Sequence, residues 1–159
     1  MIFSLVSLVS FLVFFLPFTT LAAPTAPVDE LEARGYGGKT HKVTVGDDNK
    51  LRYDPQYVYA KPGDYIKFEF HPKNHTVTES SFDYPCSKLD GGFTTGFVPV
   101  DQDEHYFPTR TFYVKDEKPH WFYCQQVGHC PAGMVFAVNP PKKGNTFKEF
   151  QKKAMHTKY

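Results

Sequence analysis

Sulfur is scarce in this sequence, whose 159 residues include only 3 cysteines and 3 methionines. The chain also lacks a large excess of either charge, because its formal net charge is +1 at pH 7. No overall positive field is present to gather phosphates, so we expect no nucleic-acid partner. Internal repeats and low-complexity tracts are absent as well. The region 41–140 is long enough for one compact domain with one core.

Charge is missing altogether from the first 28 residues, which are mostly hydrophobic. Pro17 interrupts this segment, and small residues stand before a cleavage site after Ala22. We therefore predict a signal peptide over residues 1–22 and a linker or pro-segment over residues 23–40. The expected product is a secreted, extracellular protein with no stable membrane span, with cell-wall association as an alternative destination. Disulfides persist in that oxidising environment.

Short runs rich in β-forming residues fill the region 41–140, and turn residues close each of them. In "KPGDYIKFEFHP" the apolar residues alternate with polar ones, which is the period of a half-buried strand. Seven or so such strands predict an all-β domain, a Greek-key β-sandwich or barrel. The basic tail, residues 141–159, places Phe147, Phe150 and Ala154 on one helical face. It predicts a short C-terminal helix.

Three cysteines in a secreted domain form one disulfide and leave one thiol unpaired. Cys130 could pair with Cys124, six residues earlier, and leave Cys86 free. It could instead pair with Cys86 and close a loop of about 45 residues, worth roughly 4 kcal/mol in the chain-entropy model. That second pairing leaves Cys124 as the free thiol.

The stretch "YCQQVGHCPAGM" concentrates sulfur and imidazole in one loop. Cys124, His129 and Met134 follow the spacing C-x4-H-x4-M. A type 1 copper site uses one thiolate and two imidazoles in a plane, with a weak axial thioether. The second imidazole should come from another strand, and His75 in "PKNHTVTESSF" stands at the start of one. We predict a metal site formed by these four residues.

Other interpretations of the same residues are weaker. Met134 taken alone would be a core methionine opening a strand, since methionine often fills gaps. A nucleophilic Cys/His enzyme would need an acid to orient the histidine, and none accompanies this loop, so we expect no enzyme. Structural zinc sites prefer several cysteines or histidines and tolerate a thioether poorly. Asn74, in the sequon Asn74-His75-Thr76, is a candidate for N-glycosylation.

The two segments "KPGDYIKFEFHPKNHTVTESSFDYPC" and "WFYCQQVGHCPAGMVFAVNP" together resemble the cupredoxins. The resemblance is strongest to secreted fungal cupredoxin-like proteins, which are similar to plant phytocyanins in their C-x4-H-C loop. It covers residues 41–140. It implies two imidazole ligands, a thiolate and an axial thioether, at His75, His129, Cys124 and Met134. It also implies a disulfide between Cys86 and Cys130.

The function implied by this resemblance is single-electron transfer through one type 1 copper ion. Alternatives are extracellular copper sequestration or delivery, or a surface or host-interaction module without redox turnover. The partner would be a redox or copper-exchange protein, and we expect a monomer. Four aromatic side chains are predicted to wall the site against water: Phe97, Trp121, Phe122 and Phe136.

Overall fold

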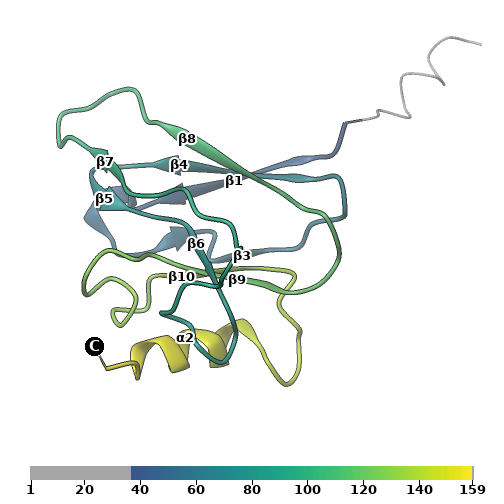
Figure 1. Ribbon diagram of the computed structural model, residues 1–159. Helices are drawn as coiled ribbons and strands as arrows, with labels where there is room; N and C mark the ends of the chain where they lie inside the picture. The colour runs from purple at the N-terminus through teal and green to yellow at the C-terminus, as the bar shows by residue number, and fades with distance from the viewer. Residues whose placement is uncertain (1–36, 159) are drawn as a thin grey trace, which may run out of the picture. The chain divides into compact units, whose positions relative to one another are not determined.

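The computed structural model describes residues 37–158. The predicted signal peptide and most of the predicted linker lie outside these residues. Two four-stranded sheets face each other across a shared core, as Figure 1 shows. The first has the order β2-β1-β4-β8, formed by Tyr53–Asp54, Thr40–Val45, Tyr65–Phe70 and Thr109–Tyr113. The second has the order β3-β10-β9-β6, formed by Tyr57–Val58, Val135–Val138, His120–Tyr123 and Thr78–Ser80.

A short two-stranded ribbon lies beside the sheets, where β5 (Lys73–His75) pairs antiparallel with β7 (Val98–Val100). Within the sheets, β1 runs parallel to β4 and β10 runs parallel to β3, while the remaining neighbours are antiparallel. A single turn of 3-10 helix, η1 (Asp47–Asn49), follows β1. The predicted Greek-key β-sandwich is confirmed.

The run "RYDPQYVYA" is rich in β-forming residues and contributes to both sheets. Its first part is β2, which pairs with β1, and its second part is β3, which pairs with β10. Pro55 stands between them and has no backbone N–H to donate to a ladder. The chain therefore leaves one sheet and enters the other within two residues of this proline.

Strand alternation builds the core between the sheets. In β4 the side chains of Ile66, Phe68 and Phe70 are fully buried, while the residues between them are more exposed. Phe68 meets Phe136 of the opposite sheet edge-on, with ring centroids 5.3 Å apart. Such aromatic pairs stabilise a core by about 0.5–1.5 kcal/mol beyond the area they bury. The predicted alternation in this strand is confirmed.

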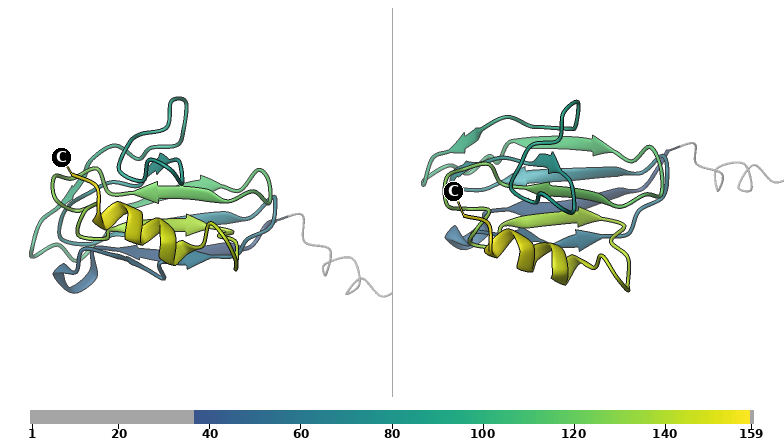
Figure 2. Two further views of the ribbon diagram at one scale, coloured as in Figure 1. Left: turned by 90° about the horizontal axis from the view of Figure 1, so that it is seen from below. Right: turned by 60° about the horizontal axis from the view of Figure 1, so that its bottom comes forward.

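The predicted C-terminal helix is α2 (Phe147–Met155), and it covers the outer face of the second sheet (Figures 1 and 2). Thr146 caps its N-terminus by accepting a hydrogen bond from the backbone N–H of Glu149. Phe150 and Ala154 are buried against Trp121 of β9 in a second, smaller apolar cluster. All four residues of β10 are buried as a result, because one face meets the core and the other meets α2. Within residues 37–158 no helix is long and apolar enough to cross a membrane.

Candidate metal centre

Two separate parts of the fold, strand β5 and the segment between β9 and β10, supply the predicted ligands. His75 is the last residue of β5, and the pairing of β5 with β7 fixes its backbone. Cys124 directly follows β9, and Met134 directly precedes β10. His129 lies in the loop that joins these two adjacent strands. The site therefore forms where the ribbon and the second sheet meet at one end of the sandwich.

The structure brings the two imidazoles to the thiol. The Nδ1 atom of His129 lies 3.4 Å from Sγ of Cys124, and the Nδ1 atom of His75 lies 3.9 Å from it. All three ligand atoms lie within 4.8 Å of one another. A metal bonded to sulfur at about 2.3 Å and to nitrogen at about 2.0 Å would separate the ligand atoms by about these distances. The three residues fit a trigonal site.

Burial makes these groups neutral in the absence of a cation. His75 and Cys124 have no exposed surface, and His129 is only 9% exposed. Burial lowers the pKa of His75 to about 4, and the nearby His129 adds to this effect. Burial also lowers the pKa of His129 and raises the pKa of the Cys124 thiol. Neutral imidazoles are ready to coordinate, and a cation between them and the thiol would favour the thiolate.

Met134 completes the group of predicted ligands and is itself fully buried. Its backbone N–H donates to the His129 carbonyl over 3.0 Å, and its own carbonyl accepts from the Cys124 N–H over 3.1 Å. The main chain thus ties Met134 to both other ligands in this loop. One thiol, two imidazoles and one thioether form a soft set that suits copper better than magnesium or calcium.

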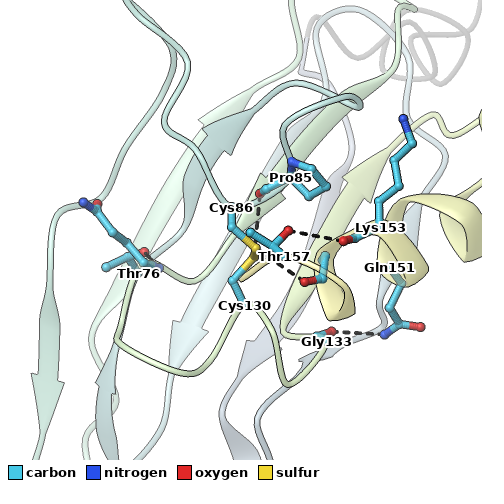
Figure 3. Close-up of a disulfide and its surroundings, with 10 residues drawn as sticks. Thr76, Pro85, Cys86, Cys130, Gly133, Gln151, Lys153 and Thr157 are labelled. Atoms are coloured by element: carbon cyan, nitrogen blue, oxygen red, sulfur yellow. Dashed lines mark hydrogen bonds between the residues drawn. A yellow bond between two sulfur atoms is a disulfide. The ribbon is translucent and has the colours of Figure 1, made fainter. Parts of the chain in front are cut away.

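The Cys86–Cys130 disulfide is present, with an S–S distance of 2.03 Å and Cα atoms 5.8 Å apart. Cys124 is accordingly the free cysteine among the described residues, and it is buried. Figure 3 shows the disulfide beside α2, whereas Nδ1 of the neighbouring His129 lies 3.4 Å from Sγ of Cys124. His129 and Cys130 therefore point to opposite sides, so that one reaches the metal centre and the other anchors the loop to residue 86.

Three residues that the sequence did not single out hold the ligands in place. The Thr76 backbone N–H donates to Sγ of Cys124 over 3.4 Å, and its Oγ1 accepts from the Gln125 N–H over 2.8 Å. The buried Tyr53 hydroxyl donates to the Thr76 carbonyl over 2.6 Å. These contacts fix the chain beside His75 and provide a hydrogen bond that stabilises a thiolate.

Gly46 is the third of these supporting residues, and it lies against the His75 ring. A Cβ atom at this position would stand 2.2 Å from Nε2 of His75, which leaves room only for glycine. Its φ of +83° also favours glycine. The Nε2 atom is buried and forms no hydrogen bond of good geometry among the described residues. Close packing therefore helps to orient this imidazole, together with a hydrogen bond to the Pro72 backbone that partly offsets the lowering of the His75 pKa by burial.

The predicted aromatic wall is partly wrong. Phe122 and Phe136 do belong to the core cluster that contains Cys124 and Met134. Trp121 faces the other side of β9 and packs on Phe150 of α2, with ring centroids 4.6 Å apart. Adjacent residues of a strand point to opposite faces, so Trp121 and Phe122 cannot both line the site. Phe97 is 53% exposed, so it does not form part of a wall that shields the site from water.

Asn74, the predicted glycosylation site, is half-buried in β5 next to His75. Its Nδ2 donates to Oε1 of Gln126 over 3.4 Å, across to the loop that carries His129. Thr76, the third residue of the sequon, is fully buried. Glycosylation of Asn74 stays a prediction.

These features define a class: a β-sandwich whose end carries a buried thiol between two neutral imidazoles. No family model matches the sequence. The chain is 28% identical over 116 residues to the "Probable GPI-anchored cupredoxin-1" of Arthroderma benhamiae, covering 73% of this chain and 59% of that protein. It is 30% identical over 116 residues to an "Extracellular serine-rich protein" of the same fungus, covering 73% of this chain and 45% of the relative. The chain thus spans about half the length of these curated relatives.

The chain is also similar to solved structures at low sequence identity. A reduced auracyanin from Roseiflexus castenholzii has a TM-score of 0.46 at 15% identity, covering 64% of this chain and 96% of that one. A pseudoazurin from Hyphomicrobium denitrificans has a TM-score of 0.45 at 19% identity, covering 76% of this chain and 99% of that one. The sequence match to a named cupredoxin agrees with the fold and with the His-Cys-His group described above. The chain is therefore similar in sequence to a cupredoxin, and it contains a His-Cys-His group that could hold a metal ion.

Proposed function

We propose that this protein binds one copper ion in a type 1 site and exchanges single electrons outside the cell. The ligands would be His75, Cys124, His129 and Met134. The observation that carries the proposal is the position of two neutral Nδ1 atoms at 3.9 Å and 3.4 Å from one buried free thiol. Soft sulfur ligands favour Cu(I), and imidazoles suit both oxidation states.

The chain's own residues would keep the site nearly unchanged between the two states. Copper, when bound, supplies the one-electron exchange. The Thr76 N–H and the Cys124 N–H hold the thiolate segment from two sides, through contacts to Sγ and to the Met134 carbonyl. The disulfide and the β5–β7 pairing hold the loop and His75. Little therefore has to move when an electron enters or leaves.

His129 is the proposed edge for electron exchange. It retains 9% exposure, whereas His75 and Cys124 retain none. Its loop neighbour Val127 is 83% exposed, so a partner protein can approach this side closely. The partner would be a redox protein, or a copper donor or acceptor. An extracellular location agrees with the names of the two fungal relatives, one described as GPI-anchored and one as extracellular.

A visible spectrum of the Cu(II)-loaded protein tests the proposal directly. We expect an intense thiolate-to-copper band near ~600 nm that is lost in Cys124→Ser. His156→Gln, which changes an exposed histidine at the end of α2, serves as a control and should keep the band. A wild-type protein that stays colourless with excess Cu(II), while Cys124 still titrates as a free thiol after unfolding, would refute the copper site.

Electrochemistry separates electron transfer from copper storage or delivery. An electron-transfer protein should cycle reversibly between Cu(I) and Cu(II) and keep its metal in the presence of a Cu(I) chelator. Release of copper to the chelator on reduction would instead support sequestration or delivery. Both measurements use the same loaded sample.

A further inference from the structure

The turn around Met134 is closed by main-chain hydrogen bonds. The Gly133 carbonyl accepts from the Val135 N–H over 2.9 Å, so Met134 sits at the middle of a tight three-residue turn. The Gly133 N–H donates to the Cys130 carbonyl over 2.9 Å. The position of the methionine therefore depends on the orientation of the Gly133 peptide.

Helix α2 reaches this peptide from outside the loop. Nε2 of Gln151 donates to the Gly133 carbonyl over 3.1 Å, a contact drawn in Figure 3. Gly133 has a φ of +89°, and a Cβ atom there would stand 3.5 Å from atoms of both Gln151 and Met155. The helix surface thus rests directly on the turn, 18 residues away in sequence.

The helix is itself firmly attached, so the amide donor is held in place. Phe150 is fully buried and packs on Trp121. Nζ of Lys153 lies 2.7 Å from a carboxylate oxygen of Asp83 and 4.4 Å from the centre of the Phe82 ring. Gln151 lies between these two anchored residues on the helix.

We propose that α2 positions the axial ligand and that Gln151 is the positioning residue, acting through the Gly133 carbonyl. The inference rests on the proposed copper site. It adds that α2 influences the weakest bond of that site, the bond to the Met134 thioether. An axial thioether bond is long and weak, so small shifts of the turn change it more than they change the bonds in the plane. Hydrogen bonds outside the ligand shell commonly tune a metal centre in this way.

The test compares Gln151→Leu with Lys152→Leu in the full chain. Both changes place leucine on the same helix, but Lys152 is exposed and does not reach the turn. We expect Gln151→Leu to change the ratio of the ~450 nm and ~600 nm bands and the rhombicity of the Cu(II) EPR signal. Lys152→Leu should match the wild type. Gln151→Glu, which keeps the size but replaces the donor by an acceptor, should change the spectrum in the same sense.

A metal-free readout accompanies the spectra. In the copper-free protein, hydrogen exchange of the Val135 amide should become about tenfold faster in Gln151→Leu, as expected for loss of one supporting hydrogen bond. A lower unfolding temperature with an unchanged band ratio would mean that Gln151 only stabilises the helix, which overturns the proposal. A wild-type protein without the ~600 nm band refutes the copper site instead, so the two failures are distinguishable.

Discussion

Four histidines of this domain form two pairs with opposite surroundings. His41 and His120 each face carboxylates: His41 pairs with Asp64 over 2.9 Å, and His120 lies between Glu79 at 2.9 Å and Asp116 at 3.2 Å. His75 and His129 face a thiol, and neither is in an ion pair within residues 37–158. Acid partners favour the protonated form of an imidazole, as at His120, whereas burial without acids favours the neutral form that can bind a metal, as at His75.

The pKa values show the same contrast. A hydrogen bond to Glu79 raises the pKa of His120, and burial lowers the pKa of His75 to about 4. The first histidine is suited to a charge pair that links β9 to β6 and to the segment before β9. The neutral imidazole of His75 is suited to bind a metal cation instead of a charged side chain of the protein. The surroundings of His120 therefore differ in charge from those of His75, which is one of the two proposed imidazole ligands.

The largest expected effect comes from replacing the histidines of these two pairs by glutamine, one at a time. His75→Gln and His129→Gln should each weaken copper binding by at least about 100-fold, since each removes an imidazole from the plane. His41→Gln and His120→Gln should leave copper affinity nearly unchanged. Competition titrations with a chelator of known affinity measure all four variants. Equal losses in both pairs would abolish the distinction.

Substitution of Gly46 tests how strongly close packing constrains the His75 ring. Gly46→Ala should destabilise the protein by about 2–3 kcal/mol, because a Cβ would overlap the imidazole. Gly144→Ala is the matched control: its φ of +73° is similar, but no atom lies within 4 Å of the added Cβ. Urea unfolding of the copper-free proteins gives both values. Similar losses would show that the backbone strain, and not the His75 contact, limits position 46.

The sequence predicted those parts of the site that depend on local spacing or on the family resemblance. Cys124, His129 and Met134 occupy one loop, so their spacing alone indicated a common metal. The supporting contacts were missed because they join distant residues, such as Tyr53 with Thr76 and Gln151 with Gly133. No periodicity or motif marks such a pair before the chain is folded.

The fold was predictable for a similar reason. Alternation in β4 and the apolar face of α2 are local patterns, and both are confirmed. The split of the run around Pro55 and the short ribbon β5–β7 depend on which sheet a segment joins, which is a tertiary choice. The misplacement of Trp121 could have been avoided, since strand alternation already assigns it and Phe122 to opposite faces.

A moderate effect is expected for the interaction of His120 with Glu79 as pH changes. The raised pKa of His120 means that its contribution to stability is complete below its unfolded pKa of about 6.5 and is lost as pH rises through the folded value. The lowered pKa of Glu79 keeps its carboxylate ionised over the same range. His120→Gln should cost about 1–2 kcal/mol near pH 6 and progressively less toward pH 9. Thermal unfolding of both proteins across this range checks the trend, and a constant difference would contradict it.

The smallest expected effect concerns the His41–Asp64 interaction. Its contribution to stability is lost as pH falls, whereas that of His120 is lost as pH rises. The hydrogen bond from His41 is the main cause that lowers the pKa of Asp64 to about 2, with help from the Lys61 and Lys39 N–H groups. Its stabilisation is complete above the unfolded pKa of 3.8 and is lost as pH falls toward 2. Asp64→Asn should lower the unfolding temperature at pH 5 and converge with the wild type near pH 2. Asp48→Asn, which removes only an exposed pair with Lys50, should show almost no difference at either pH. If Asp64→Asn were equally destabilising at both pH values, the amide geometry rather than the charge would be responsible, and His41 would not be the acid-paired histidine that the comparison requires.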